Sequence, residues 1–499
     1  MYRSLQLLKT SRHVLWHAKS LFATGSACQK LLEMPPCDYE PQPYTGKTPD
    51  QTLNVRKDKL SPTYFLYHPS SPVVIHEGKM QWLWDHNNKR YLDLFGGIVT
   101  VGVGHCHPKV NKAVKAQMDK LWHTTQIYMH PNIHEYAERL TEKLPGDLKV
   151  CFFVNSGSEA NDLAMFLARH YTKSFDFISL RNGYHGASPY VMGVTAVGTW
   201  KYNHPVGFGV HQTMNPDVYR GLWGGSNCRD SIAQTTRTCN CAEGHCEASD
   251  KYIAEFEDML KHSCGQNVAG FIAEYIQGVG GTVQLPKGFL PKAYELIRAR
   301  GGVCISDEVQ TGFGRLGTSF WSFEEASVVP DIVTMAKSIG NGYPLAAVVT
   351  TPEIASVMGE AIHFNTFGGN ALGSAVGMAV LDAMEEDGTQ QNSQIVGTHL
   401  LSELLKLRDE FEVVGDVRGK GFMLGLELVT DKESKNPLPA ADINEIWDDI
   451  KDMGVLIGKG GLYGNALRIK PPMCITKQDA DFAASVMRAA LQNYTQKRS

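Results

Sequence analysis

The chain of 499 residues lacks any apolar run that approaches the ~18 consecutive residues of a membrane helix. Hydrophobic residues make up 43% of the sequence and charged residues 20%, which is typical of soluble globular proteins. We therefore expect no membrane partner. A chain of this length is expected to form more than one domain.

Acidic residues are absent from the first 32 positions, where the charged residues are Arg3, Lys9, Arg12, Lys19 and Lys30. Leucine and serine lie between these charges, a composition typical of mitochondrial transit peptides. A secretory signal is excluded because the charges interrupt every apolar stretch. We interpret residues 1–40 as a transit peptide and linker that direct the protein to the mitochondrial matrix. An ordinary basic tail is the alternative.

The remainder of the chain is acidic. The formal net charge is −4 for the whole chain and +5 for its first 32 residues, so the rest carries −9. Negative charge opposes the phosphate backbone of nucleic acids, and we expect no nucleic-acid partner.

The C-x2-C pairs of structural zinc sites are absent among the eleven cysteines. An odd number of cysteines without a secretory signal indicates free thiols in a reducing compartment. Four of them nevertheless gather in the segment Cys228–Cys246, with Cys239 and Cys241 in a C-x-C spacing. Zinc is one interpretation of this segment. The irregular spacings favour an ordinary loop insertion, and we expect no metal.

A nucleotide-binding fingerprint lacks its structural context. Gly312 to Gly317 matches G-x-G-x-x-G, but Asp307 and Glu308 separate these glycines from the preceding apolar run. The residues that follow do not begin an amphipathic helix. This argues against a nicotinamide-dependent dehydrogenase.

Two short apolar runs each end in an ionisable residue. Val303 to Ser306 precedes Asp307, and Ile332 to Ala336 precedes Lys337. Both runs are typical of buried strands, whose carboxyl ends line the ligand crevice of open α/β sheets. A solvated lysine and a salt-bridged aspartate are the alternative.

One cofactor uses a buried lysine and an acid together. Pyridoxal phosphate binds a lysine amine as a Schiff base and needs an acid at its pyridine nitrogen, which keeps the ring an electron sink. A lysine beside apolar residues also tends to have a lowered pKa. Lys337 and Asp307 are therefore the candidate catalytic pair.

The surrounding sequence resembles the class III pyridoxal-phosphate aminotransferases. DEVQTGFGR from Asp307 and PDIVTMAKSIGNGYP from Pro330 match the family signature, and the similarity extends from about residue 60 to the end. The resemblance implies fold type I, an α/β large domain with a mostly parallel seven-stranded sheet and a smaller α+β domain from both chain ends. We assign residues 41–105 to the small domain, 106–362 to the large cofactor-binding domain and 363–499 to the small domain.

Local patterns predict further elements. Apolar and polar residues alternate around Asn87-Asn88, which indicates a β-hairpin. Ser156 and Glu159 have the spacing of a capping box, so Gly157 and Ser158 are expected at a helix N-terminus, which favours anions.

The resemblance implies roles for individual residues. Gly157 and Ser158 would hold the cofactor phosphate, Tyr184 would cover the pyridine ring and Gln310 would bind the ring oxygen. Thr366 would reach the cofactor phosphate of the neighbouring subunit in a homodimer or homotetramer. Glu274, near the end of another apolar strand, is a further cofactor-binding candidate. From the residues alone, a plain capped helix, a packing tyrosine and a polar loop remain open.

Arg468 lies between Leu467 and Ile469, an unusual place for a charge unless an anion binds there. The resemblance implies a substrate carboxylate. An arginine on the solvent face of an edge strand is the alternative. Val279 stands where relatives that act on terminal amino groups often carry glutamate.

The resemblance implies a ping-pong transfer of an amino group from alanine to glyoxylate or pyruvate. β-Amino acids such as 3-aminoisobutyrate, and methylated arginines, would be other donors. A decarboxylase or aminomutase of the same fold is one alternative. A binding protein that kept the fold and lost activity is another, and the presence of Lys337 with Asp307 argues against it.

Overall fold

A computed structural model describes residues 32–203, 207–242 and 244–498 of the chain. The predicted transit peptide lies outside the described residues, except for residues 32–40. Residues 32–499 form one compact unit, so the domain boundaries at residues 105 and 362 stay predictions. Within the described ranges, no helix has the length and apolar content needed to cross a bilayer.

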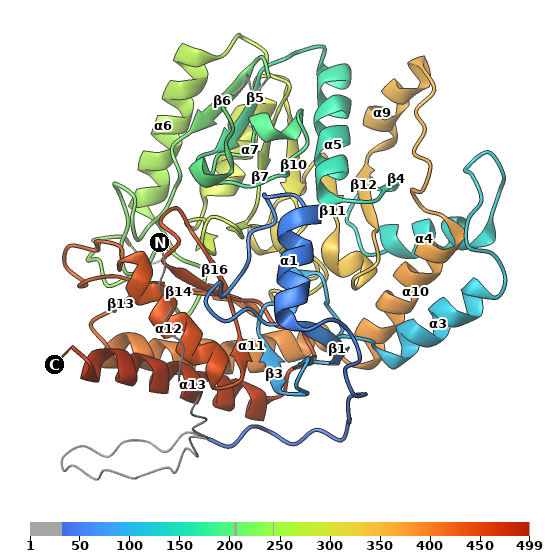
Figure 1. The fold of residues 1–499 in the computed structure, drawn as a ribbon. Coiled ribbons are helices and arrows are strands. Elements are labelled where there is room, and N and C mark those ends of the chain that lie inside the picture. Colours follow the sequence, from blue (N-terminus) through green and yellow to red (C-terminus); the bar gives the residue numbers. More distant parts are fainter. Residues whose placement is uncertain (1–31, 204–206, 243, 499) are drawn as a thin grey trace, which may run out of the picture. The chain divides into compact units, whose positions relative to one another are not determined.

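A seven-stranded sheet forms the centre of this unit (Figure 1). In spatial order its strands are β4 (Val150–Val154), β12 (Ala346–Thr350), β11 (Ile332–Met335), β10 (Val303–Asp307), β7 (Gly270–Ala273), β5 (Phe177–Leu180) and β6 (Val210–Thr213). Only β12 pairs antiparallel with its neighbours. The predicted mostly parallel seven-stranded sheet is confirmed.

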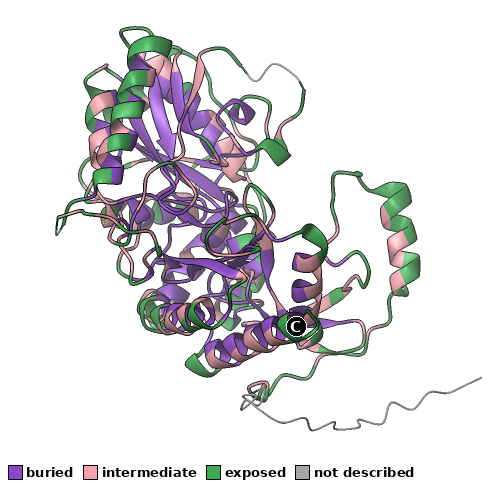
Figure 2. Ribbon diagram, turned by 90° about the vertical axis from the view of Figure 1, so that its left-hand side faces the viewer, coloured by how far each residue is buried: buried purple, intermediate pink, exposed green. Residues whose placement is uncertain are grey.

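Helices and loops cover the central sheet, whose middle strands β7, β10, β11 and β12 are buried throughout (Figure 2). This burial explains why the strands are continuous apolar runs rather than alternating ones. The longer helices of this region are α5 (Gly157–Thr172), α6 (Glu247–Ser263) and α7 (Phe289–Arg298). Short elements connect them: η1 (Val191–Gly193), η2 (Gly198–Trp200), α8 (Ser322–Glu325), η3 (Lys337–Gly340), α9 (Pro352–Ala355) and η4 (Ser356–Glu360).

Three smaller sheets complete the fold, and the first of them joins residues from both ends of the chain. One sheet joins β1 (Ile75–Lys79), β2 (Trp82–Asp85), β3 (Arg90–Asp93) and β15 (Val455–Leu456). A second has the order β13 (Val414–Lys420), β14 (Met423–Leu428), β17 (Ala466–Ile469) and β16 (Gly458–Gly460), and a third pairs β8 (Ile276–Gln277) with β9 (Val283–Gln284). The parallel pairing of β3 with β15 confirms that early and late segments share one layer.

The remaining helices come from the same two regions of sequence. They are α1 (Pro49–Lys59), α2 (Gly96–Val99), α3 (Pro108–Met118), α4 (Pro131–Thr141), α10 (Ala371–Glu386), α11 (Thr389–Glu410), α12 (Ala440–Asp452) and α13 (Lys477–Gln496). Helix α10 packs against α3 and α4, and α13 packs against α11 and α12. The predicted hairpin is also present, since β2 and β3 pair antiparallel around Asn88, whose φ is 59°.

The glycines of the G-x-G-x-x-G match have a packing role. Gly317 has a φ of 86°, and a Cβ there would lie 2.5 Å from the backbone of Gln394 in α11. Only glycine allows the loop to approach the helix so closely. The glycines do not open a helix, because residues 318–321 separate Gly317 from α8, which is only four residues long. This agrees with the argument against a dinucleotide site.

Candidate active site

Strands β10 and β11 bring the two predicted catalytic residues to one edge of the sheet. The strands pair in parallel with Asp307 opposite Thr334, and Lys337 follows three residues later. Because parallel strands end at the same edge, the carboxylate and the amine both reach the crevice beyond the strands. Both line one cavity of about 110 Å³.

Three hydrogen bonds fix the Asp307 carboxylate. Its Oδ2 accepts from His185 Nδ1 at 2.8 Å and from Asn161 Nδ2 at 2.9 Å, and its Oδ1 accepts from the Val309 N–H at 3.0 Å. The aspartate is only 2% exposed. His185 and Asn161 were missed by the sequence analysis, because nothing local links them to Asp307.

The next residue, Glu308, has a different role. Successive strand residues point to opposite faces, so Glu308 faces away from Asp307. Its carboxylate accepts hydrogen bonds from Ser306, Thr311, Ser322 and the Phe323 N–H. Burial raises its pKa, although these donors lower it. Glu308 anchors the loop after β10 and does not line the cavity.

Lys337 occupies a strained backbone position at the end of β11. Its φ is 56°, in the left-handed region that non-glycine residues rarely adopt, and such strain is common at functional sites. Within the described chain, no hydrogen bond or ion pair holds its amine. Burial lowers the Lys337 pKa, and Arg468 lowers it further, while Asp307 and Glu274 raise it. Because its pKa is lowered, a larger fraction of the amine is neutral at neutral pH and available as nucleophile or proton acceptor.

The cavity contains most of the predicted site residues. Its lining is Ser156, Gly157, Ser158, Asn161, Tyr184, His185, Gly186, Glu274, Asp307, Val309, Gln310 and Lys337. Of the residues predicted to bind the cofactor, only Thr366 does not line it. Arg468 lies outside the lining but close enough for its charge to act on Lys337.

The N-terminus of α5 supplies backbone donors to this cavity. Ser156 caps the helix by accepting from the Glu159 N–H at 3.2 Å, while Glu159 turns back to the Asn155 N–H instead of completing the expected capping box. Among the described residues, the Gly157 and Ser158 N–H groups have no acceptor. Free N–H groups and the helix dipole together favour an anion.

A glycine lets the opposite wall approach this helix end. Gly186 has a φ of 139°, and a Cβ there would lie 2.6 Å from Ser158 Oγ. A larger residue would therefore fill the space in front of α5.

Tyr184 and Glu274 form another wall of the cavity. The half-buried Tyr184 ring packs edge-on against Trp200, with 5.0 Å between ring centroids. Glu274 accepts hydrogen bonds from the Tyr184 N–H at 3.1 Å and from the Gly278 N–H at 2.7 Å. Burial raises the Glu274 pKa, and Asp307 raises it too, while His185 lowers it.

Lys470 is a second buried lysine that the sequence analysis missed. Its Nζ donates to Gln310 Oε1 and to the Gly278 carbonyl, both at 3.1 Å. Because the Gln310 oxygen accepts from Lys470, the Gln310 NH2 is left free to donate. Arg468 and Lys470 alternate with apolar residues in one strand-like run, and this pattern could have indicated that both cations point into the same site.

Arg468 lies in an interior strand, which removes the alternative of a solvent-facing edge strand. Strand β17 is flanked by β14 and β16, and Arg468 is 4% exposed, with Gly425 and Gly458 as its cross-strand neighbours. Its Nε and Nη2 are buried without a hydrogen-bond partner among the described residues. The guanidinium lies over the Phe95 ring, 5.2 Å from its centroid, but this contact does not satisfy the two N–H donor groups. Buried donors without acceptors are costly, so a bound anion would stabilise this arrangement.

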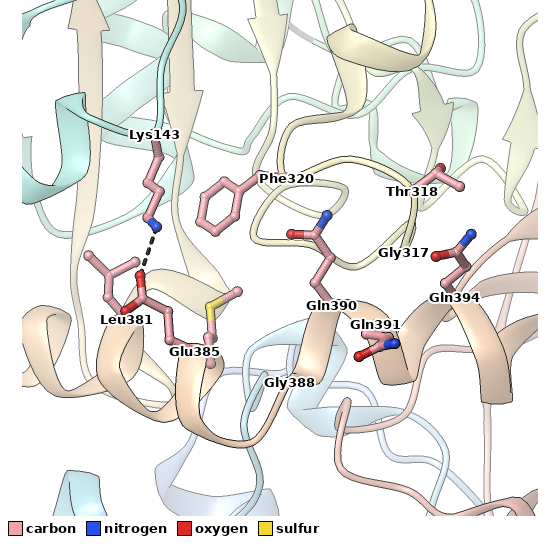
Figure 3. Close-up of a pocket in the computed structure, with 11 residues that line it drawn as sticks. Lys143, Gly317, Thr318, Phe320, Leu381, Glu385, Gly388, Gln390, Gln391 and Gln394 are labelled. Atoms are coloured by element: carbon pink, nitrogen blue, oxygen red, sulfur yellow. Dashed lines mark hydrogen bonds and ion pairs between the residues drawn. The ribbon is translucent and has the colours of Figure 1, made fainter.

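A larger cavity of about 400 Å³ does not share this chemistry. It lies between the loop at Gly317 and helices α10 and α11, where Figure 3 shows glutamine side chains and an ion pair. That pair joins Lys143 Nζ to Glu385 Oε1 at 2.7 Å, and both side chains are substantially exposed. None of the predicted site residues lines this cavity.

The residues around Lys337 fit pyridoxal phosphate. The site offers a free amine, a fixed carboxylate, a donor-rich helix end and an aromatic ring, which match the aldehyde, pyridine nitrogen, phosphate and ring of this cofactor. The fold and the site thus define a fold-type I enzyme that works through pyridoxal phosphate.

Comparisons with known proteins give the family. The profile of the aminotransferase class-III family matches residues 66–491, and the chain belongs to this family. Human alanine–glyoxylate aminotransferase 2, mitochondrial, is 55% identical over 467 residues, which are 93% of this chain and 91% of the human protein. The chain is therefore an aminotransferase that moves amino groups between amino acids and oxo acids.

Solved structures place the fold among transaminases and a related lyase. An (S)-enantioselective ω-transaminase from Thermomicrobium roseum has a TM-score of 0.80 and 30% identity, covering 90% of this chain and 100% of that one. A phospholyase from Arthrobacter in complex with phosphoethanolamine has a TM-score of 0.79 and 30% identity, covering 88% and 99%. The fold alone therefore does not fix the reaction.

The electrostatics of Lys337 predict the pH dependence of cofactor attachment. In the apoprotein, the rate of covalent attachment should rise with pH and level off below the pH that an ordinary lysine of pKa 10.5 would require, because only the neutral amine reacts. Arg468→Gln removes a positive charge, raises the Lys337 pKa and should move the plateau to higher pH. Glu274→Gln removes a negative charge and should move it to lower pH. Absorbance after rapid mixing measures the rate.

The control for this experiment is Lys337→Ala, which should bind no cofactor covalently and yield no borohydride-labelled peptide at this position. Equal plateaus in the parent and both charge variants would contradict the electrostatic account. Labelling of another lysine in the parent would contradict the assignment of Lys337.

Proposed function

We propose that the enzyme transfers the amino group of alanine to glyoxylate, releasing pyruvate, and that pyruvate itself serves as an acceptor for donors other than alanine. The observation that carries this proposal is the buried guanidinium of Arg468 close to the Lys337 amine, with Nε and Nη2 lacking hydrogen-bond acceptors among the described residues. A small acid has little besides its carboxylate for recognition, so a preformed carboxylate site suits such substrates. The name of the human relative, which specifies alanine and glyoxylate, supports the same substrates. β-Amino acids such as 3-aminoisobutyrate, and methylated arginines, are further proposed donors.

The site residues divide the chemistry among them. Bound pyridoxal phosphate supplies the electron sink that stabilises negative charge at the substrate carbon. Asp307, held by His185 and Asn161, keeps a proton on the pyridine nitrogen. Lys337 is the general base that takes the proton from the substrate carbon and the general acid that returns it.

Other residues orient the reactants. The Gly157 and Ser158 N–H groups would hold the phosphate, and Tyr184 would cover the ring, with Glu274 fixing the Tyr184 loop. Gln310, oriented by Lys470, donates to the ring oxygen.

Val279 leaves Arg468 available in both half-reactions. Val279 and Arg468 both lie against Gly460. A Cβ at Gly460 would be 3.2 Å from the Val279 carbonyl oxygen and 2.7 Å from Arg468 Cδ, so the two residues are close to each other. Valine offers no carboxylate that could pair with the guanidinium. A glutamate at the same position would compete with the substrate.

Removal of the guanidinium tests the carboxylate site. A paired arginine–carboxylate contact contributes on the order of 1.5–3 kcal/mol, or roughly ten- to a hundredfold in binding. Arg468→Ala should raise the KM for alanine and glyoxylate by about tenfold or more while the cofactor absorbance stays unchanged. Arg468→Lys should restore only part, because a point charge cannot make the paired contact. Val279→Glu should weaken small-acid binding in the same direction.

The matched control is Val279→Gln, which keeps the size of glutamate without its charge and should weaken binding less. Steady-state assays with alanine, 3-aminoisobutyrate, glyoxylate and pyruvate measure these effects. Unchanged KM values in both Arg468 variants would contradict the proposal. Release of carbon dioxide without stoichiometric pyruvate from alanine would instead favour a decarboxylase.

We propose that the enzyme is a homodimer or homotetramer in which Thr366 reaches the cofactor phosphate of the neighbouring subunit. Thr366 is exposed, on a surface where residues 121–129 meet residues 362–368. Gln126 Nε2 donates to the Gly368 carbonyl at 3.2 Å, which ties the two segments together. Met129 is 91% exposed and Ile362 97% exposed, which is unfavourable unless another subunit covers them.

Charged substitutions test this assembly. Met129→Asp should lower the mass measured by light scattering to that of a monomer and reduce cofactor retention. Phe175→Asp, at an apolar residue that is also exposed but lies elsewhere, is the matched control and should leave the mass unchanged. Thr366→Ala should weaken cofactor binding without changing the mass. A monomeric parent that retains its cofactor would contradict the shared site.

We propose import into the mitochondrial matrix, from the basic and acid-free residues 1–32 and the mitochondrial name of the human relative. Residues 1–40 fused to a reporter should carry it into mitochondria, where it should resist external protease until the inner membrane is opened. The same segment with Arg3, Lys9 and Arg12 changed to glutamate is the control and should leave the reporter outside. A cytosolic reporter with the native segment would contradict the proposal.

A further inference from the structure

Three cysteine thiols converge in the segment between β6 and α6, and a fourth cysteine lies next to them. The Sγ atoms of Cys228, Cys239 and Cys241 all lie within 4.8 Å of one another. Cys246 directly precedes Glu247, whose N–H donates to Cys241 Sγ at 3.4 Å, so Cys246 lies beside this group. The spacings favoured an ordinary loop, but the fold also brings Cys228, which is distant in sequence, to the C-x-C pair.

The size of the cluster matches a metal centre. Tetrahedral zinc–thiolate bonds of about 2.3 Å place neighbouring sulfurs about 3.8 Å apart, so small shifts of the thiols would complete the coordination. All four cysteines are free thiols, with Cys228 and Cys246 buried and Cys239 and Cys241 half-buried. His245 lies beside the cluster in sequence, but its Nε2 pairs with Asp250 Oδ2 at 2.8 Å.

The surroundings of the thiols suit negative charge. Helix α6 begins at Glu247, directly after Cys246, so the positive end of its dipole faces the cluster. The Glu247 N–H donates to Cys241 Sγ at 3.4 Å. Hydrogen bonds from backbone N–H groups to sulfur are the outer contacts that stabilise thiolate ligands.

A crosslink would also stabilise this segment, because its described residues have no regular secondary structure of their own. Apart from residue 243, which is not described, residues 214–246 contain no helix or strand. Long irregular segments require other ties to stay ordered. This one places Arg229, next to Cys228, in a paired contact with Asp416 of β13 at 2.6 and 3.0 Å. A metal at Cys228 would therefore fix a support of the sheet that carries Arg468.

We propose that Cys228, Cys239, Cys241 and Cys246 bind one structural Zn²⁺. Each thiol releases its proton to solvent as its zinc–sulfur bond forms, and no oxidation is involved. Four protein ligands close the coordination sphere, so the metal stabilises the segment and takes no part in amino transfer. None of the four residues lines the cavity at Lys337.

Metal analysis of the intact, cofactor-loaded enzyme tests this proposal. Protein without a histidine tag, purified under reducing conditions and given ZnCl2 before gel filtration, should hold about one zinc per chain. X-ray absorption should show four sulfurs at about 2.3 Å. Cys239→Ser combined with Cys241→Ser should remove most of the zinc and increase proteolysis within residues 214–246. The absorbance of the bound cofactor should persist in this variant.

Cys264→Ser is the matched control. Cys264 forms a second group with Asp176 and His211, in which the carboxylate already accepts from His211 and the Gly265 N–H. Zinc content should be unchanged in this variant, and its loss there would overturn the assignment.

Alkylation of thiols at lysis, followed by mass spectrometry, needs no variant. The four cysteines should be protected by zinc and become reactive when a chelator removes it. Iron in place of zinc, a disulfide among the four cysteines, or a protein without metal whose four thiols react freely would each overturn the proposal.

Discussion

The burial of the Lys337 amine beside the Asp307 carboxylate is the constraint on which the rest of the site depends. A lysine at the end of a buried strand loses its hydration, which lowers its pKa, and nearby carboxylates offset only part of this loss. The amine must stay unpaired to react, whereas the carboxylate must not move. Asp307 accepts three hydrogen bonds, from His185, Asn161 and the Val309 backbone, which fix its position. The Lys337 amine has no hydrogen-bond partner among the described residues and is free to react.

Sequence reasoning succeeded where one strand or helix end determines the outcome. The apolar runs before Asp307 and Lys337 predicted β10 and β11, because a fully buried parallel strand tolerates few polar residues. The Ser156 cap predicted the start of α5 for an equally local reason. The mostly parallel arrangement and the pairing of both chain ends came from family resemblance, since strand order depends on contacts between distant residues.

The residues that were missed act only through long-range contacts. His185 and Asn161 meet Asp307 from separate loops and helices, and no spacing in the sequence indicates this. In the cysteine segment, too, the sequence does not show a contact between residues that are distant along the chain. Ligand-spacing rules describe metal sites built by one local turn, whereas Cys228 approaches the C-x-C pair only because the segment folds back on itself.

The buried guanidinium of Arg468 would also couple substrate binding to the state of Lys337, if it binds the substrate carboxylate as proposed. Arg468 lowers the pKa of both Lys337 and Lys470, while Glu274 raises the pKa of all three groups. A substrate carboxylate bound to Arg468 would neutralise part of that charge. The Lys337 pKa would then rise, and the amine would become a stronger base when it has to accept the proton from the substrate carbon. The unpaired guanidinium costs stability in the free enzyme, but it makes the base respond to the arrival of an acid.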